Sequence, residues 1–327
     1  MNTARHNESA VIESRLNGNV IGPTVAGYFN LPAYNGCEFF FRGCNDTYRL
    51  KTIGHHYALR VYRYGWRSLA EIRSELKLLE QLGLIAEIVA SPVIPESKDP
   101  IITFEAPEGK RYAILFEWVA GHPPDYASSQ QAETFGVNMA KLHQSFDLLP
   151  MTETRKPIDL DVLFRQPMEK LMSQKSITPD NKQVLEQVEQ LLKLRLTHQA
   201  LSSLSWGLCH GDAHAGNARI SGEQLFFFDF DFCGPGWRLY DLATYCWASM
   251  LRWQPEECRQ AFLQGYLTQG NLPPQSIDLL KEFVILRQLW FLGYELERQN
   301  IVGCGYFSTE YFSHHIGFLK YLMETIK

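Results

Sequence analysis

Short runs of aromatic and β-branched residues, separated by polar turns, fill residues 37–63. Runs of this kind are typical of β-strands, and the glycines at 43 and 54 mark turns between them. Three neighbouring short strands predict an antiparallel sheet. Two more apolar runs follow later and are joined by a hairpin turn at residues 107–110. The expected strands are residues 37–41, 47–52, 57–63, 101–106 and 111–119.

The apolar period lengthens to three or four residues between Ser68 and Gly83. Leucine and isoleucine recur at this spacing, which places them on one face of a helix. Ser68 and Glu71 have the spacing of a capping box, and Gly83 is a typical stop signal. We therefore expect one helix between the third and fourth strands.

Helical periodicity dominates the rest of the chain. Ser128 opens a segment whose apolar residues lie on one face, and the expected helices are residues 128–146, 181–204, 238–253, 255–269, 275–299 and 306–325. Between Trp206 and Asp229 short strand-like pieces alternate with turns, and residues 233–238 are expected to form a turn before a helix. This pattern predicts an α+β fold, with a β-rich lobe over residues 1–119 and a larger, mainly helical lobe over residues 120–327.

Composition narrows the class of protein. The chain has 327 residues, a net charge of −5 and 45% hydrophobic residues, so it can bury a core and disorder is not expected. Clustered basic residues, which nucleic-acid binding requires, do not occur, so no nucleic-acid partner is expected. No apolar stretch has the length of a membrane span, and seven cysteines without metal-ligand spacing favour a cytoplasmic protein. Nothing in the pattern indicates an oligomeric state.

Acidic and aromatic residues are concentrated in the second part of the chain. Residues 1–119 carry 13 acidic and 13 basic side chains, whereas residues 120–327 carry 23 acidic and 18 basic ones. Aromatic residues are dense after Phe226, where core packing accounts for most of them. A lobe of this kind also suits a small cationic molecule, through carboxylates and cation–π contacts.

One polar insert in the helical half carries residues suited to chemistry. The loop HGDAHAGN, residues 210–217, places Asp212 and Asn217 five positions apart, and Asp229 ends the apolar run that follows. Asp and Asn oxygens suit a hard cation such as Mg²⁺, and no His or Cys pair with ligand spacing lies nearby to favour zinc. A carboxylate, metal ligands and a short loop that joins them are what phosphoryl transfer needs.

The motifs HGDAHAGN and FFDFDFCGPGWRLYDLA resemble the signature of the aminoglycoside phosphotransferase and choline kinase-like superfamily. The resemblance covers most of the chain. It implies a two-lobed protein-kinase-like fold, with a small antiparallel sheet and one helix in the N-terminal lobe and a larger helical C-terminal lobe. It also implies that Asp212 is the catalytic base, that Asn217 and Asp229 hold Mg²⁺, and that Asp241 braces the catalytic loop.

The N-terminal part contains candidate nucleotide-binding residues. A kinase-like site requires a cation on a strand, paired with a glutamate on the next helix, and Arg60 and Glu75 occur in this order. The alternative is an exposed strand arginine and a surface glutamate. Arg60 stands where protein kinases usually have a lysine, and RGCNDTYRL takes the place of their GxGxxG loop. Gly43 and Asn45 are therefore candidates either for nucleotide contact or for an ordinary hairpin turn, and the resemblance places adenine contacts on the main chain at Glu117–Val119.

Several residues near the loop have two interpretations. His214 either steadies the transferring phosphoryl group or makes a loop hydrogen bond, and His210 is expected to organise the loop. The resemblance assigns Asp229 to the metal, and Asp231 either contacts the acceptor or bonds to a loop. Trp290 and Tyr294 share a helical face and are candidates for acceptor contact, although core packing is the simpler interpretation of Trp290.

The sequence thus predicts an enzyme that moves the γ-phosphoryl group of a Mg²⁺-bound nucleotide, ATP or GTP, to a hydroxyl of a small molecule. A cationic amino alcohol, an aminoglycoside-like or a homoserine-like acceptor fits the acidic, aromatic lobe. The alternatives are a protein Ser/Thr kinase of the bacterial stress-kinase type and a nucleotide-binding pseudokinase without turnover. A metallophosphoesterase is disfavoured, because the additional His and Asp motifs of that class do not occur.

Overall fold

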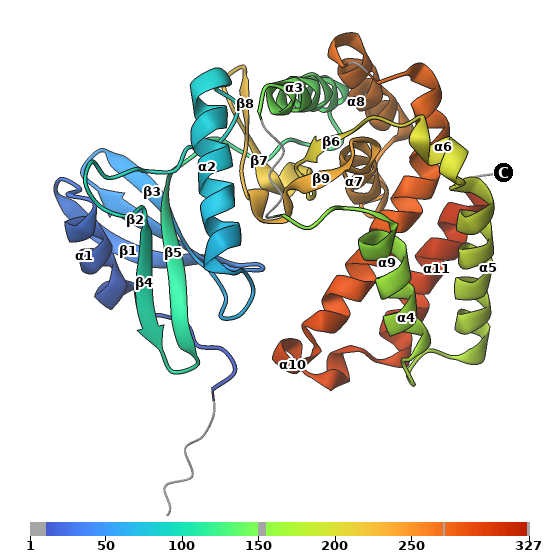
Figure 1. Cartoon of the computed structure of the whole chain (residues 1–327), viewed down its shortest axis with the longest axis horizontal. Coiled ribbons are helices and arrows are strands. Elements are labelled where there is room, and N and C mark those ends of the chain that lie inside the picture. Colours follow the sequence, from blue (N-terminus) through green and yellow to red (C-terminus); the bar gives the residue numbers. More distant parts are fainter. Residues whose placement is uncertain (1–10, 150–154, 271, 326–327) are drawn as a thin grey trace, which may run out of the picture. The chain divides into compact units, whose positions relative to one another are not determined.

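The computed structural model describes residues 11–149, 155–270 and 272–325 (Figure 1). Two compact units result. The first comprises the chain up to Glu80 together with Ala90–Val119, and the second comprises Gln81–Val89 together with the chain from Ala120 onward. Gln81–Val89 belongs to the second unit because the Phe227 N–H donates to the Ile88 carbonyl at 2.7 Å and Val89 forms a β-bridge with Phe227.

The first unit is built on one five-stranded antiparallel sheet. Its strands are β1 (Tyr34–Arg42), β2 (Asp46–Thr52), β3 (His55–Val61), β4 (Ile101–Ala106) and β5 (Gly109–Glu117), in the order β1-β2-β3-β5-β4 (Figure 1). Tyr48 and Leu50 of β2 are fully buried, as expected for a strand with one face in the core. The five predicted strands and their antiparallel pairing are confirmed.

The predicted helix is α2 (Leu69–Ile85), whose residues up to Glu80 belong to this unit. Its capping box is present: the Glu71 N–H donates to Ser68 Oγ at 3.2 Å, and the Ser68 N–H donates to Glu71 Oε2 at 2.9 Å. The prediction that Gly83 ends the helix is wrong, because the helix continues to Ile85. A glycine inside a helix costs only about 1 kcal/mol, and the fully buried Leu82 anchors this turn in the core.

This unit also contains a helix that the pattern does not predict, α1 (Gly18–Tyr28). The expectation of one helix in the N-terminal lobe is therefore wrong. Its glycines and Pro23 weaken its helical propensity. The same glycines let it approach β1: a Cβ on Gly18 would lie 2.3 Å from the Cys37 carbonyl oxygen, and one on Gly22 would lie 2.4 Å from Cys37 Cβ. Packing against the sheet therefore stabilises α1, which propensity alone does not predict.

Helices make up most of the second unit (Figure 1). They are α3 (Ser129–Asp147), α4 (Gln166–Met172), α5 (Pro179–Arg195), α6 (His198–Ser202), α7 (Leu239–Met250), α8 (Glu256–Gln269), α9 (Leu280–Glu297), α10 (Gln299–Val302) and α11 (Thr309–Thr325). Helix α3 packs against α8, α7 against α9, and α11 against both α5 and α9. The predicted helix at 181–204 divides into α5 and α6, because Thr197 Oγ1 accepts from the Ala200 N–H at 3.2 Å and caps a new helix.

Two short antiparallel ribbons accompany these helices. Strand β6 (Trp206–Cys209) pairs with β9 (Gly234–Trp237), and β7 (Ala218–Ser221) pairs with β8 (Gln224–Phe227). The turn predicted at 233–238 is wrong, since most of it forms β9. Its Gly236 serves close packing, because a Cβ there would lie 2.9 Å from Ile158 Cβ.

Aromatic side chains fill much of the core of the second unit. Phe135, Tyr245 and Phe262 are almost fully buried, and their rings contact one another at centroid distances of 4.0–6.0 Å. Core packing therefore explains a large part of the aromatic content after Phe226.

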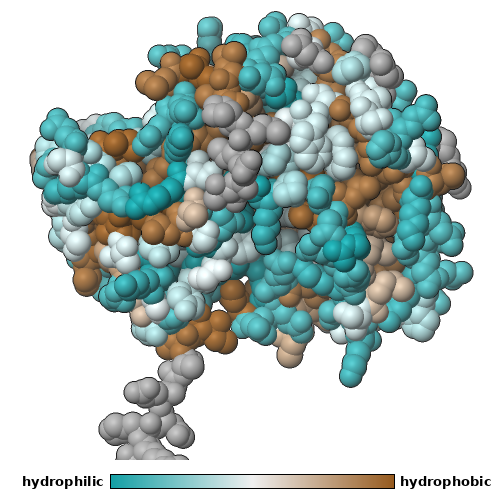
Figure 2. Space-filling model, viewed as in Figure 1, coloured by the Kyte–Doolittle hydropathy of each residue, from teal (hydrophilic) through white to brown (hydrophobic). Residues whose placement is uncertain are grey.

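Within the described residues, no helix has both the length and the apolar character needed to span a membrane. Hydrophilic and hydrophobic residues are interspersed over the face seen in Figure 2.

Candidate active site

The loop of residues 210–217 lies between β6 and β7 and is fixed by Asp241 at the start of α7. Asp241 Oδ2 accepts from the His210 N–H at 2.7 Å, and Oδ1 accepts from the Gly211 N–H at 2.8 Å. His143 Nε2 lies 3.0 Å from the same carboxylate. Burial by itself raises the pKa of Asp241, but the bonds from His143 and the Gly211 N–H outweigh it and lower the pKa. A buried charged carboxylate therefore holds the backbone of the loop.

Gly211 is required by the shape of this loop. Its φ is +80°, and a Cβ there would lie 2.2 Å from the Phe232 carbonyl oxygen. Both the left-handed backbone and the close contact exclude other residues. Asp212 thus follows a turn that only glycine can make.

The Asp212 carboxylate is held on both sides. Asn217 Nδ2 donates to Asp212 Oδ2 at 2.9 Å and to the Asp212 carbonyl at 3.0 Å. Arg287 of α9 donates to the other oxygen, Oδ1. Burial by itself raises the pKa of Asp212, but the charges of His214 and Arg287 outweigh it and hold the pKa well below its usual range. Asp212 is therefore ionised, fixed in orientation, and 16% exposed at its side chain.

The two loop histidines make different contacts. His210 is fully buried, its Nε2 lies 3.1 Å from the Phe228 carbonyl oxygen, and burial lowers its pKa. His214 is partly exposed: its Nδ1 accepts from the Gly216 N–H at 3.0 Å, and its Nε2 lies 3.5 Å from Asp212 Oδ2. Both histidines make hydrogen bonds in or beside the loop. The organising role expected of His210 stays a prediction. A role of His214 at the phosphoryl group stays a prediction.

Asn217 and Asp229 flank the open end of the β7–β8 ribbon. The Phe228 N–H donates to the Asn217 carbonyl at 3.0 Å, which keeps the two ends together. Asp229 has the left-handed conformation φ 64°, ψ 63°, which is uncommon outside glycine and typical of functional sites. The described residues contain no group of three or more His, Cys, Asp and Glu side chains arranged for a metal. The two oxygen donors fit Mg²⁺, which takes its other ligands from phosphates and water.

The chain around Asp231 differs from the expectation. Strand β8 ends at Phe227, so the strand-like stretch expected for the two acids does not form. The left-handed Asp229 turns the chain, and Phe230–Phe232 form a 3-10 turn. Asp231 is completely buried, and its carbonyl accepts from Arg155 at 2.8 Å. Complete burial supports a structural role for Asp231 over contact with an acceptor.

In the first unit, Arg60 of β3 and Glu75 of α2 form a buried ion pair. Arg60 Nη1 donates to Glu75 Oε1 at 2.6 Å, and the Tyr62 hydroxyl donates to Oε2 at 3.0 Å. The Arg60 side chain is 10% exposed and that of Glu75 is 1% exposed. The alternative of an exposed arginine and a surface glutamate is therefore wrong.

Gly43 and Asn45 lie in the turn between β1 and β2. The Gly43 N–H donates to the Asn45 carbonyl at 3.1 Å, and Asn45 Oδ1 accepts from the Arg63 N–H at 3.2 Å. These are the bonds of a well-ordered hairpin turn. Contact of either residue with a nucleotide stays a prediction.

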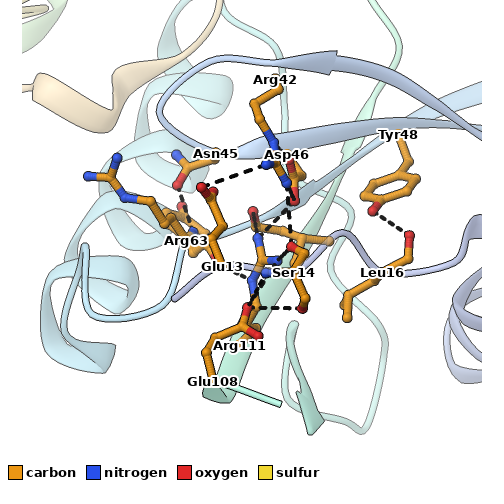
Figure 3. A network of polar contacts seen from close by, with 12 residues as sticks. Glu13, Ser14, Leu16, Arg42, Asn45, Asp46, Tyr48, Arg63, Glu108 and Arg111 are labelled. Carbon is orange, nitrogen blue, oxygen red and sulfur yellow. Dashed lines mark hydrogen bonds and ion pairs between the residues drawn. The ribbon is translucent and has the colours of Figure 1, made fainter. Parts of the chain in front are cut away.

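A buried polar network centred on Arg111 lies beside this turn (Figure 3). Arg111 Nη2 donates to Asp46 Oδ2 at 3.0 Å, and Nη1 donates to the Ser14 carbonyl at 2.8 Å. Arg42 Nε donates to Asp46 Oδ1 at 2.7 Å, and the Ser14 N–H donates to Glu108 Oε1 at 3.1 Å. The network joins strands β1, β2 and β5 to the segment around Ser14. No motif marks it, because Ser14 and Arg111 are 97 positions apart.

Glu117 ends β5, and Val119 follows two residues later. The Glu117 N–H donates to the Ser91 carbonyl at 2.9 Å, and the Trp118 N–H donates to the His56 carbonyl at 3.3 Å. Adenine contacts here stay a prediction. Because the Glu117 and Trp118 N–H groups already donate within the chain, we expect adenine to contact the Glu117 carbonyl and the Val119 N–H.

Arg287 is the residue of this site that the sequence reasoning missed. Besides Asp212, its Nη1 donates to the Gly211 carbonyl at 3.3 Å and to the Tyr240 hydroxyl at 3.2 Å. Its guanidinium lies 4.4 Å from the ring centroid of Trp290 and 4.8 Å from that of Trp247. An arginine within the apolar run VILRQLWFL was the available signal, because a buried charge requires a partner.

Trp290 and Tyr294 share one face of α9, as predicted. Their rings stack at 5.4 Å with an angle of 7°. Both rings contact Phe232, at 5.0 Å and 5.5 Å, edge to face. Since the Phe232 carbonyl lies against Gly211, this face lies beside the loop of residues 210–217. Contact of Trp290 or Tyr294 with an acceptor stays a prediction.

Comparison with known proteins identifies the family. Residues 43–277 match the Phosphotransferase enzyme family. The chain belongs to this family. It is 35% identical over 285 residues to an uncharacterized protein of Deinococcus radiodurans, which covers 85% of this chain and 82% of that protein. The superfamily predicted from the sequence motifs is therefore confirmed.

Solved structures confirm the kinase-like fold of this phosphotransferase. A microcompartment-associated aminopropanol kinase has a TM-score of 0.72 at 22% identity, with 92% of this chain and 94% of that chain covered. An amicoumacin kinase in complex with AMP-PNP, Ca²⁺ and Ami has a TM-score of 0.70 at 19% identity, with 93% of each chain covered. The family match includes Asp212, Asn217 and Asp229 but ends at residue 277, so Arg287 lies outside it.

Proposed function

We propose that this phosphotransferase moves the γ-phosphoryl group of a Mg²⁺-bound nucleoside triphosphate to a hydroxyl group of a small molecule. The observation that carries this proposal is the Asp212 carboxylate, ionised and held from both sides in a loop fixed by Asp241. A carboxylate so placed is suited to orient an attacking hydroxyl and to accept its proton.

Arg60 and Glu75 support the nucleotide part of the proposal. Kinases hold the α- and β-phosphates with a strand cation that a helix glutamate fixes, and the buried 2.6 Å pair has this form. Burying two charges is costly, so such a pair is better explained by a binding role than by stability. The amicoumacin kinase similar to this chain was solved with AMP-PNP and Ca²⁺, which supports a nucleotide and a divalent cation as ligands here.

Asn217 and Asp229 are the residues that would hold the cation. A bound Mg²⁺ would neutralise charge on the β- and γ-phosphates during transfer. The chain's own part is to fix these two donors at the end of the β7–β8 ribbon. The low pKa of Asp212 fits the same chemistry, because a loose transition state needs an oriented hydroxyl more than a strong base.

The small-molecule acceptor is supported by the similar proteins. An aminopropanol kinase and an amicoumacin kinase, both named for small molecules, have TM-scores of 0.72 and 0.70 with this chain. The pseudokinase alternative is disfavoured because Asp212, Asn217 and Asp229 are all present and Asp212 is held in a defined orientation.

Substitution of Asp212 by asparagine tests the function. We expect the protein to phosphorylate members of a panel of small alcohols in a reaction that depends on Mg²⁺ and on ATP or GTP. Release of the nucleoside diphosphate and ³¹P NMR of the product measure this reaction. Asp212→Asn should lower kcat by about 10²–10⁴-fold, the usual contribution of a positioned base, with nucleotide affinity retained. Asp161→Asn, in an exposed pair with Arg165, is the matched control and should keep full activity. Wild-type turnover by Asp212→Asn would refute the assignment.

A further inference from the structure

Aromatic rings beside the catalytic loop lie against arginines of the chain itself. Tyr126, whose hydroxyl accepts from the Ala215 N–H of the loop at 2.9 Å, lies 5.2 Å from the guanidinium of Arg252. Tyr294 lies 5.8 Å from the guanidinium of Arg298. The rings of Trp290, Trp247 and Tyr240 surround Arg287 at 4.4, 4.8 and 5.9 Å. Each of these rings thus already carries a guanidinium group of the chain.

Arg287 is the central member of this set. Its side chain is only 3% exposed, and it bonds to the carboxylate of Asp212. Its buried Nε has no hydrogen-bond partner among the described residues, whereas its Nη groups bond to Asp212, to the Gly211 carbonyl and to the Tyr240 hydroxyl. We call the rings of Tyr240, Trp247 and Trp290 the Arg287 cage. The Arg287 guanidinium fills this cage. It also bonds to Asp212, which in the proposed function places the acceptor hydroxyl.

Two acidic residues near the end of α9 are also matched. Glu295 Oε1 accepts from Arg298 at 2.9 Å, and Glu297 pairs with Lys170. Carboxylates neutralised in this way do not attract a cation from solution. The acidic excess of this lobe is therefore weak evidence for a cationic acceptor.

We propose that Arg287 occupies the position that a cationic acceptor would take, so that the true acceptor is a hydroxyl compound whose neighbouring group is uncharged or a carboxylate, not an ammonium. The proposal rests on the proposed function, because Asp212 places the acceptor hydroxyl. The ring faces that Arg287 covers are closed to an ammonium group of an acceptor. This replaces the cationic acceptor expected from charge and aromatic content.

Saturation-transfer difference NMR at constant ionic strength measures the binding of tetramethylammonium. It tests whether Arg287 excludes a cation from the cage, and it needs no turnover. The wild-type protein should show no saturable binding up to about 50 mM, because the rings are occupied. Arg287→Ala empties the cage and should bind the probe saturably, at least tenfold more tightly than wild type. Arg287→Lys is the matched control: it keeps a cation between the rings and should exclude the probe.

Two results would overturn the proposal. Saturable binding of tetramethylammonium to wild type as tight as to Arg287→Ala would show that the resident guanidinium does not exclude cations. Lack of binding to Arg287→Ala would show that the rings are not a cation site at all. Should Arg287→Ala fail to fold, the wild-type titration decides alone, since saturable binding there contradicts the proposal and its absence supports it.

Kinetics on the wild-type enzyme give an independent test. Choline and its uncharged isostere 3,3-dimethylbutan-1-ol differ chiefly in charge, and glycerate adds a carboxylate. We expect kcat/KM for the uncharged alcohol or for glycerate to exceed that for choline at least tenfold, and a preference for choline would overturn the proposal. If no acceptor or nucleotide is turned over, the proposed function fails, whereas the tetramethylammonium titration still decides the inference.

Discussion

At the residue scale, the charged side chains of the candidate active site have hydrogen-bond or ion-pair partners beside them. Asp241 is fully buried, yet it accepts two backbone N–H groups and contacts His143. Asp212 is held between Asn217 and Arg287. Charged carboxylates make stronger hydrogen bonds than neutral groups do, which lets the loop keep one geometry without regular secondary structure.

Substitution of Asp241 by asparagine tests the brace. The amide has one acceptor oxygen in place of two, so one loop N–H loses a charge-assisted bond worth about 1.5–3 kcal/mol. We expect kcat to fall about 10- to 100-fold while the nucleotide dissociation constant changes less than threefold. Steady-state kinetics and nucleotide titration measure both. A variant with normal kcat, judged against Asp161→Asn, would show that the loop holds its shape without this charge.

Local sequence and distant contacts contribute differently at this scale. Asp212, Asn217 and Asp229 are recognisable from spacing, because the loop and the ribbon that position them are continuous in the chain. Arg287 is 75 positions from Asp212, and only the packing of α9 brings the two together. The same packing turns Trp290 from a candidate ligand for a foreign cation into a partner of the chain's own arginine.

At the element scale, stability of the sheet depends on polar groups as well as on its apolar face. Arg111 of β5 is fully buried and bonds to Asp46 at the start of β2 and to the Ser14 carbonyl. Burial of this cation is tolerated because several acceptors surround it, as Figure 3 shows. Removal of Arg111 would leave the buried Asp46 paired with Arg42, whose side chain is 31% exposed.

Arg111→Met should therefore destabilise the protein by about 3–5 kcal/mol, the usual cost of breaking a buried ion pair. Arg49→Met is the matched control, since Arg49 pairs with Glu38 on an exposed strand surface, and it should cost less than about 1 kcal/mol. Urea denaturation, monitored by tryptophan fluorescence, gives the free energy of unfolding of both variants. Equal losses in the two variants would contradict a special role of the network.

The elements that the pattern misplaces share one cause. Helix α1 contains glycine and proline, and β9 contains two glycines and a proline, so local rules predict loops or turns. In both cases those small residues permit close packing, of α1 against β1 and of β9 against β6 and Ile158. Tertiary contacts therefore override local propensity at these elements.

At the scale of the whole molecule, the chain forms two compact units, and each carries one part of the proposed machinery. The Arg60–Glu75 pair belongs to the first unit, and Asp212, Asn217 and Asp229 belong to the second.

Binding of a Mg²⁺-nucleotide should raise the melting temperature of the full chain. At a concentration 100 times its dissociation constant, Mg²⁺ with AMP-PNP should add about 2.7 kcal/mol of stability, or several degrees in Tm. Removal of Mg²⁺ with EDTA should reverse most of the shift. The Asp229→Asn variant should lose the part that depends on Mg²⁺, whereas Asp161→Asn should keep it. No shift with either the ATP or the GTP analogue would contradict nucleotide binding.

The sequence alone determines the family, the α+β class, the five strands, most helices and the residues of the catalytic loop, because each of these depends on patterns that are local along the chain. The order of strands, the helix α1, the Arg111 network and the contact of Arg287 with Asp212 are decided only by tertiary structure. These features join residues that are far apart in sequence, and their energies come from packing and charge pairing in the folded interior. The proposed acceptor class depends on the same packing, since that packing places Arg287 against the aromatic rings.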